Sequence, residues 1–251
     1  GCDGSVLIDS TKDNRAEKES PGNQSVRGFE LIDDVKEQLE KQCPGVVSCA
    51  DIVAMAAREA VALSGGGNYS QEVQYMTYQK EEKMEGGLRL KILSLRLLQL
   101  LMPRSSLESL ASVVFSAQDM VALSGGHTLG VARCLTFKNR LSDPVDPTMD
   151  SDFSKNLSKT CSGGDNAEQT FDTTRNNFDN FYFQALQRKS GVLFSDQTLY
   201  NNPITQSIVK GYAMNQAKFF LDFQQAMVKM SLLDVKEGSQ GEVRADCRKI
   251  N

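Results

Sequence analysis

The chain has one histidine in 251 residues, His127. A function that needs two imidazoles therefore requires a second histidine from outside these residues. It has no Cys-x-x-Cys zinc pattern. Its hydrophobic stretches are too short, or too interrupted by charge, to span a bilayer. The formal net charge of −4 argues against general nucleic-acid binding. These absences predict a soluble protein with no membrane and no nucleic-acid partner.

What is present favours a secreted protein. There are six cysteines, and three Asn-x-Ser sequons begin at Asn23, Asn68 and Asn156. The chain is long enough for one large domain or two lobes, and 40% of its residues are hydrophobic.

Helical spacing dominates the hydrophobic pattern. Phe29, Ile32, Val35 and Leu39 mark one amphipathic helix over 28–40, which ends near Cys43. Further helices are expected over 49–63, 119–124, 130–141, 177–189, 202–222 and 223–230, with Phe219, Phe220 and Phe223 in the core. Strand signals are weak, so the sequence predicts a mainly α fold.

His127 is the best metal-ligand candidate in the chain. It lies in the small-residue run VALSGGHTLG over 121–130, which offers no other obvious reason for an imidazole. An imidazole binds iron through one nitrogen when a partner orients the other. The alternative, a histidine satisfied by local hydrogen bonds, stays open on the residue alone.

Several ordered motifs resemble the secreted plant haem peroxidases, the class III family. They are GCDGS at 1–5, VSCAD at 47–51, LSGGHT at 123–128, FDN at 178–180, GVLFSDQ at 191–197, FQQAMVKM at 223–230 and GEVRADC at 241–247. The resemblance covers about 1–66 and 115–251. It implies the plant haem peroxidase fold, a single domain over 1–251 whose two helical lobes enclose haem: a partial distal lobe, 1–114, and a proximal lobe, 115–247.

The resemblance assigns the proximal site. His127 is implied to be the axial ligand of haem b iron, and Asp196 to accept a hydrogen bond from its other nitrogen. Such a carboxylate gives the imidazole imidazolate character, which suits peroxide chemistry better than oxygen storage. A calcium ion is implied at Thr128, Asp172, Thr174 and Asp179. The spacing is one residue shorter than the commonest family form, so Thr173 stays open as an alternative to Thr174.

The resemblance also assigns part of a distal site. A second calcium is implied at Gly1, Asp3, Ser5 and, through water, Glu17. Glu17 and Asn23 are implied to connect this calcium to a catalytic distal histidine. That histidine and a distal arginine have no counterpart here and would lie just upstream of Gly1. We therefore expect an N-terminally truncated chain that has little or no peroxidase activity as it stands.

The cysteines fit the same expectation. The resemblance implies disulfides between Cys49 and Cys247 and between Cys134 and Cys161. It leaves Cys2 and Cys43 unpaired here, since their partners would lie upstream.

The segment 73–114 departs from the family pattern, because it is Lys/Glu-rich and then Leu-rich. Synonymous codons for 80–94 can be chosen so that a neighbouring reading frame gives a string resembling the family. We therefore expect a frame shift in this segment; a genuine amphipathic insertion helix is the alternative.

The resemblance implies a donor:hydrogen-peroxide oxidoreductase with haem b and two Ca²⁺. Its partners would be hydrogen peroxide and small phenolic reductants, and it would act as a monomer in the cell wall, extracellular space or vacuole. Two other hypotheses remain. One is a non-catalytic remnant, such as a pseudogene product that retains haem- and calcium-binding elements. The other is an all-helical interaction protein in which His127 is structural.

Overall fold

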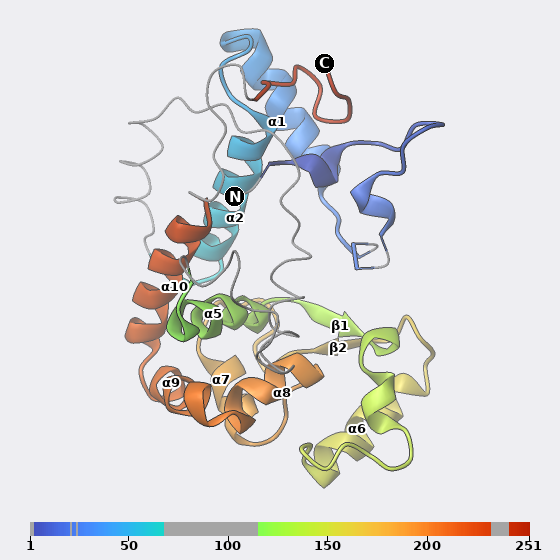
Figure 1. Cartoon of the computed structure of the whole chain (residues 1–251), viewed down its shortest axis with the longest axis vertical. Helices are drawn as coiled ribbons and strands as arrows, with labels where there is room; N and C mark the ends of the chain where they lie inside the picture. Colours follow the sequence, from blue (N-terminus) through green and yellow to red (C-terminus); the bar gives the residue numbers. More distant parts are fainter. Residues whose placement is uncertain (1–2, 21, 24, 68–114, 232–240) are drawn as a thin grey trace, which may run out of the picture. The chain divides into compact units, whose positions relative to one another are not determined.

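The fold is mainly α-helical, as predicted. The computed structural model describes residues 3–20, 22–23, 25–67, 115–231 and 241–251, which contain eight α-helices and one pair of short strands (Figure 1). The helices are α1 (Phe29–Gln42), α2 (Cys49–Leu63), α5 (Ala117–Ser124), α6 (Ser151–Cys161), α7 (Phe181–Gln187), α8 (Phe194–Asn201), α9 (Pro203–Met214) and α10 (Gln216–Ser231). None of these described helices has the length and apolar character needed to cross a membrane.

The described residues belong to two compact units. The first contains residues up to 60 and the C-terminal residues from 230, and the second contains 61–67 and 115–229. The expected lobe boundary at 114 and the expected frame-shifted segment 73–114 lie outside the described residues, so both remain predictions.

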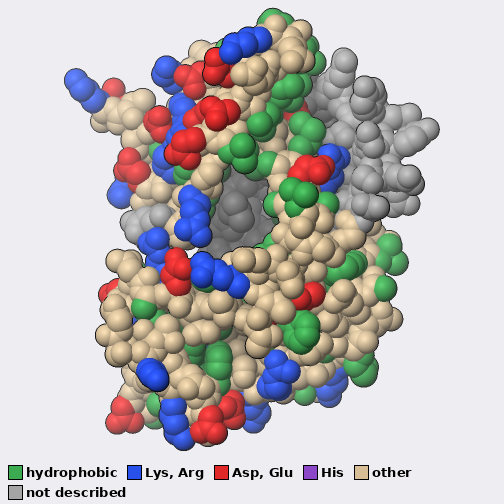
Figure 2. Space-filling model, turned by 180° about the vertical axis from the view of Figure 1, so that it is seen from behind, with side chains coloured by type: hydrophobic (Ala, Val, Ile, Leu, Met, Phe, Trp, Pro, Cys, Tyr) green, Lys and Arg blue, Asp and Glu red, His purple; other side chains and the backbone are tan. Residues whose placement is uncertain are grey.

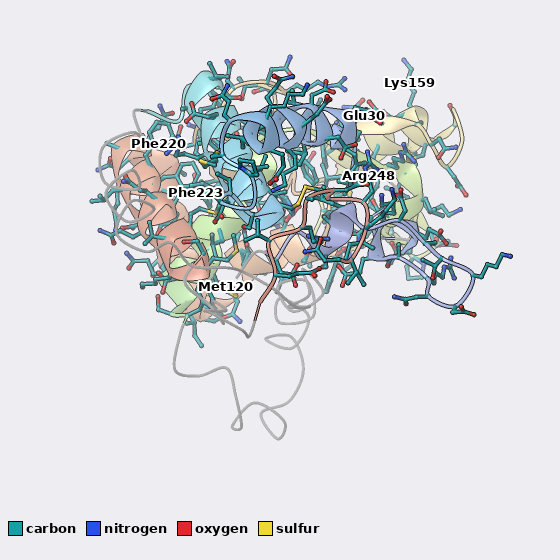
Figure 3. All side chains as sticks on the ribbon, turned by 90° about the horizontal axis from the view of Figure 1, so that it is seen from above. Glu30, Met120, Lys159, Phe220, Phe223 and Arg248 are labelled. Atoms are coloured by element: carbon teal, nitrogen blue, oxygen red, sulfur yellow. A yellow bond between two sulfur atoms is a disulfide. The ribbon has the colours of Figure 1, made fainter. Side chains whose placement is uncertain are left out.

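The first unit is built on α1 and α2. Its core contains Leu7, Ile32, Ile52 and the disulfide between Cys49 and Cys247. Arg248 binds Asp33 of α1 through two nitrogens, with Nε 2.8 Å from Oδ2 and Nη2 2.5 Å from the same oxygen. Arg248 and Glu30, which lies at the start of α1, are both labelled in Figure 3. The C-terminal residues are thereby tied to the helices near the start of the chain.

The predicted apolar face of α1 needs one correction. Val35 is 38% exposed, whereas Lys36 is 2% exposed. The Lys36 stem fills the buried side, and its ammonium group donates to the Val47 carbonyl at 2.6 Å and to Glu40 at 2.5 Å. A lysine can take a buried position because its stem is apolar and its charge is satisfied.

The second unit has an aromatic core. The members of this core are each no more than 2% exposed: Phe178, Tyr182, Phe183, Tyr212 and Phe219. Phe178 stacks on Phe219, and the other ring pairs are edge to face or tilted. They come from the loop before α7 and from α7, α9 and α10. Of the phenylalanines predicted for the core, Phe219 and Phe223 are buried and Phe220 is partly buried. Figure 3 labels Phe220 and Phe223 on α10, with Met120 on α5.

The helix predicted over 130–141 is wrong. Gly130 has φ 91°, a left-handed conformation that ends helical structure, and the chain then forms β1 (Val131–Arg133). β1 pairs antiparallel with β2 (Glu168–Thr170), with Ala132 opposite Gln169 (Figure 1). Two 3₁₀ turns follow at Cys134–Thr136 and Lys138–Leu141. Pairing with a distant strand overrides the local helical pattern.

Two predicted boundaries are also wrong. The helix expected over 202–222 breaks at Asn215, whose extended backbone separates α9 from α10, so the expected last helix 223–230 lies inside α10. The Asn215 side chain accepts from the Lys218 amide at 2.9 Å and so caps α10. The helix expected from 177 begins instead at Phe181. The predictions for 49–63 and 119–124 agree with α2 and α5.

Two helices were not predicted. α6 begins after Asp150, whose carboxylate accepts from the backbone amides of Asp152 and Phe153. This is an N-cap that the sequence displays. α8 carries Asp196 in its first turn.

Charged side chains of both signs are intermixed on the face drawn in Figure 2. Several charged side chains of the described residues form ion pairs, among them Lys138 with Asp165 and Arg175 with Glu168. Exposed pairs of this kind contribute little to stability.

Candidate functional site

His127 lies in a 3₁₀ turn, Gly125–Thr128, that continues directly from α5. α5 begins with a capping box, in which Ser116 and Asp119 each accept a hydrogen bond from the other's backbone amide. At Gly125 a Cβ would lie 2.4 Å from a ring carbon of Phe219 and 2.7 Å from one of Phe183. Glycine therefore lets the turn that carries His127 pack directly on the aromatic core.

Asp196 orients the imidazole. His127 Nδ1 lies 2.9 Å from Asp196 Oδ1, although 69 residues separate the two in sequence. Because a carboxylate is only an acceptor, Nδ1 carries the proton and donates it. Asp196 is 2% exposed and also accepts from the Leu193 backbone amide at 3.4 Å. The two residues that the sequence singled out are therefore brought into direct contact.

Aromatic rings set the plane of the imidazole. Phe171 stacks on His127 with ring centroids 4.5 Å apart and planes 9° apart, and Tyr182 meets the ring edge-on. The His127 side chain is nevertheless 41% exposed. No group in the described residues hydrogen-bonds to Nε2. The ring is thus held by one nitrogen and two aromatic neighbours, while the second nitrogen is available to a ligand.

The charges around His127 shift the pKa values of two groups. Desolvation opposes protonation of His127, but the negative charge of Asp196 and its hydrogen bond outweigh this and raise the His127 pKa. Burial, together with the Asp196 charge and hydrogen bond, raises the pKa of Tyr182 well above its ordinary value. Tyr182 therefore stays a neutral hydroxyl donor across the physiological pH range.

A cluster of oxygen atoms surrounds the neighbouring residue, Thr128. Its Oγ1 lies 2.7 Å from Asp172 Oδ2 and 3.3 Å from Asp179 Oδ1. It also lies 3.5 Å from the Asn177 carbonyl oxygen. Thr128 is 1% exposed, and the two aspartates are 7% and 8% exposed. Within the described residues, neither carboxylate forms an ion pair with a lysine or arginine.

This cluster has the chemistry of a calcium site. Two buried carboxylates without a basic partner are unfavourable unless a cation neutralises them. Calcium prefers carboxylate, hydroxyl and carbonyl oxygens, all of which are present. Thr174 Oγ1 lies 3.1 Å from Asp172 Oδ1, whereas Thr173 is exposed. Geometry therefore favours Thr174 over Thr173 as the further oxygen donor.

A second oxygen cluster lies in the first unit. The Ser5 hydroxyl donates to Glu17 at 2.8 Å, and the Ser5 amide donates to Asp3 Oδ1 at 2.9 Å. The Asn23 side-chain amide donates to the Glu17 carbonyl at 2.9 Å. Asp3, Ser5, Glu17 and Asn23 thus form one connected set. Gly1, the remaining residue expected there, and Cys2 lie outside the described residues.

Arg244 fixes the backbone of this second cluster. It donates to the carbonyls of Gly4 at 3.0 Å and Asp3 at 3.3 Å, more than 200 residues away in sequence. Gly4 has φ 65°, and a Cβ there would lie 3.0 Å from Arg244 Nη2 and 3.2 Å from the Ala50 amide. A glycine is therefore required where the arginine approaches.

Both predicted disulfides are present, Cys49–Cys247 and Cys134–Cys161. Cys43 forms no disulfide within the described residues. Sequence reasoning gave no role to Tyr182, Phe171, the Asn177 carbonyl or Arg244. Only the fold shows that Tyr182 and Phe171 contact His127, because nothing in their local sequence marks them.

Comparisons with known proteins identify the family of the chain. The family model described as Peroxidase matches residues 1–215. Over its whole length the chain is 61% identical to Peroxidase 47 of Arabidopsis thaliana, of which it covers 75%. It is 39% identical to Peroxidase 66 of the same plant and 38% identical to Peroxidase P7 of Brassica rapa subsp. rapa, again over its whole length, and covers 78% and 84% of them.

The chain belongs to the peroxidase family and to its class III plant branch. The predicted family and, by family, general haem peroxidase activity are confirmed; haem and calcium are the cofactors that this family generally uses.

Proposed function

We propose that haem b iron binds to Nε2 of His127 and that Asp196 supports this ligand from the opposite side of the ring. The observation that carries the proposal is the 2.9 Å contact between Nδ1 and a buried carboxylate, which leaves Nε2 without a partner among the described residues. Metal-bound histidines almost always donate their other N–H to such an acceptor.

Bound haem supplies the redox chemistry by which hydrogen peroxide is reduced and a small phenolic donor is oxidised. The residues of this chain hold and tune that group. Asp196 draws the Nδ1 proton and makes His127 a stronger electron donor, while Phe171 fixes the ring plane by stacking. The stronger electron donation from His127 favours the more oxidised states of iron, which peroxide chemistry requires.

Two calcium ions complete the proposal. One binds Thr128, Asp172, Thr174 and Asp179, and the Asn177 carbonyl is a further donor to it. The other binds Asp3, Ser5 and the Gly1 carbonyl, with Glu17 acting through water. The convergence of hydroxyl and carboxylate oxygens at both places supports these assignments.

Glu17 and Asn23 are proposed to connect the second calcium to a distal histidine. That histidine would move a proton from one peroxide oxygen to the other, and an arginine would stabilise the developing negative charge. The single imidazole of these 251 residues is already assigned to iron. The polypeptide by itself is therefore proposed to bind haem with little turnover, and a non-catalytic remnant is the alternative.

The protein is further proposed to be secreted, to the cell wall, extracellular space or vacuole, and to be monomeric. Two disulfides within the described residues support an oxidising compartment.

Haem titration tests the central assignment. The apoprotein should give a saturable Soret band with haem, and His127→Gly should lose it. Exogenous imidazole added to His127→Gly should restore the band, because it replaces the missing ligand in a fold that is still intact. A His127→Gly protein that binds haem with an unchanged spectrum would exclude His127 as the ligand.

A further inference from the structure

Asp196 Oδ1 is shared between two donors. His127 Nδ1 lies 2.9 Å from this oxygen, and the Tyr182 hydroxyl donates to the same oxygen, also at 2.9 Å. Among the described residues, the other carboxylate oxygen accepts only a long bond of 3.4 Å, from the Leu193 amide. The His127 N–H and the Tyr182 hydroxyl therefore compete for the electron density of one oxygen atom.

The competition takes place where water cannot relieve it. Tyr182 is 1% exposed and Asp196 is 2% exposed. In such an environment hydrogen bonds are electrostatically stronger, and each bond to an acceptor changes the strength of the others. When a carboxylate oxygen accepts a hydrogen bond from a hydroxyl, it carries less negative charge for a second donor. The hydrogen bond that it accepts from the neighbouring N–H is therefore weaker.

We infer that Tyr182 is a positioning residue that moderates the Asp196–His127 pair: its hydroxyl limits how far Asp196 polarises the imidazole. The inference rests on the proposed role of His127 as the iron ligand. The Tyr182 ring also meets the His127 ring edge-on, but its hydroxyl donates to Asp196, so the effect of the hydroxyl on His127 passes through that carboxylate. Removing its hydroxyl strengthens the His127–Asp196 hydrogen bond and makes His127 a stronger donor to iron.

The chain offers a matched control. Tyr212 is also fully buried, belongs to the same aromatic core and donates its hydroxyl to a buried carboxylate, Asp222 Oδ2, at 2.8 Å. Tyr212→Phe therefore removes the same hydroxyl from the same kind of bond. No contact links Asp222 to His127, so any general effect of the change on the core should be equal in both variants.

The first readout uses the apoprotein. Because His127 is the only histidine, the imidazole region of an NMR spectrum contains one Nδ1–H signal. Tyr182→Phe should move that proton downfield, as a stronger hydrogen bond requires, and Tyr212→Phe should leave it in place. This readout does not depend on haem, so a failure of the proposed function would not hide the result.

The second readout uses the haem-loaded protein. Tyr182→Phe should shift the Fe(III)/Fe(II) equilibrium toward the ferric form by roughly fivefold, the effect of one net hydrogen bond. Tyr212→Phe should leave it unchanged. An unmoved Nδ1–H signal, or an upfield shift that marks a weaker bond, would overturn the inference, as would equal changes in both variants.

Discussion

Adjacent residues, His127 and Thr128, lie in two different environments. The imidazole is held by a carboxylate and aromatic rings, and the hydroxyl lies inside a cluster of carboxylate and carbonyl oxygens. One peptide bond joins them. A cation bound at Thr128 would therefore stabilise the backbone that carries the proposed iron ligand.

Calcium binding should distinguish the two candidate threonines. Thr174→Ala should weaken calcium binding by roughly tenfold or more, because it removes an oxygen 3.1 Å from Asp172. Thr173→Ala should bind calcium as the parent chain does, because that side chain is exposed. Isothermal calorimetry on calcium-stripped protein measures both, and the reverse order would assign Thr173 instead.

Much of this residue-scale chemistry could be predicted, and some could not. The pairing of His127 with Asp196 followed from a resemblance in short motifs. Tyr182 could not be found in the same way, because its role depends on where α7 passes the His127 turn. The Asn177 carbonyl was also beyond prediction, since a backbone donor depends on loop conformation and not on side-chain type.

At the scale of elements, α5 and the 3₁₀ turn that follows it position His127 and Thr128. α1 was predictable because an apolar face marks it, whereas α6 was missed although the sequence shows its N-cap, Asp150. The strand β1 was not predictable, because its partner β2 is contributed by residues 35 or more positions later in the chain. The division between α9 and α10 also escaped prediction, because the apolar pattern continues across Asn215.

Two adjacent glycines test how the His127 turn packs. Gly125→Ala should destabilise the fold by about 1–3 kcal/mol, because its Cβ would lie 2.4 Å from Phe219 and a buried ring must move. Gly126→Ala is the control, since its Cβ would meet Phe223 only at 3.7 Å. Urea unfolding of both variants compares them. Equal stabilities would show that the turn does not pack closely on the core.

The start of α5 should give the fold a pH dependence. Burial opposes ionisation of Asp119, but hydrogen bonds from Lys229 and Ser116 outweigh it and lower the Asp119 pKa. Because the pKa is lower in the folded than in the unfolded protein, the ionised Asp119 stabilises the fold at every pH above its unfolded-state pKa of about 3.9. This stabilisation is lost as the pH falls through the folded-state pKa.

Replacement of this carboxylate tests that dependence. Asp119→Asn should cost about 2 kcal/mol near pH 7, and the difference from the parent should shrink as the pH falls below about 4. Asp152→Asn removes an exposed pair with Lys155 and should change little. Unfolding free energies between pH 3 and pH 7 measure both. A pH-independent difference would contradict the role of the Asp119 charge.

For the whole molecule, the family and the general reaction follow from the sequence as a set of ordered motifs. The structure adds that the residues of those motifs converge on two places within the described part of the chain, the His127 turn and the Ser5–Glu17 cluster. Each carries part of the proposed machinery, and the arrangement of the described residues supports cofactor binding more fully than it supports proton transfer.

The rate of turnover by the 251-residue polypeptide tests whether its residues support cofactor binding more fully than proton transfer. Loaded with haem, it should oxidise a phenolic donor with hydrogen peroxide at least roughly 10²-fold more slowly than a plant peroxidase that has a distal histidine, because its only imidazole is assigned to iron. Stopped-flow mixing with peroxide measures the rate. Fast peroxide-dependent turnover would contradict the assignment of His127 or reveal another acid–base group.

The most direct test of the account is the iron–histidine stretching frequency of the ferrous, haem-loaded polypeptide, measured by resonance Raman spectroscopy. The account predicts a mode that falls to lower frequency in Asp196→Asn, since an amide polarises Nδ1–H less than a carboxylate does. It predicts no change in Asp222→Asn, which alters a buried carboxylate that makes no contact with His127. Absence of the mode, or a frequency that is the same in Asp196→Asn as in the parent, would contradict the claim that Asp196 supports His127 as the iron ligand.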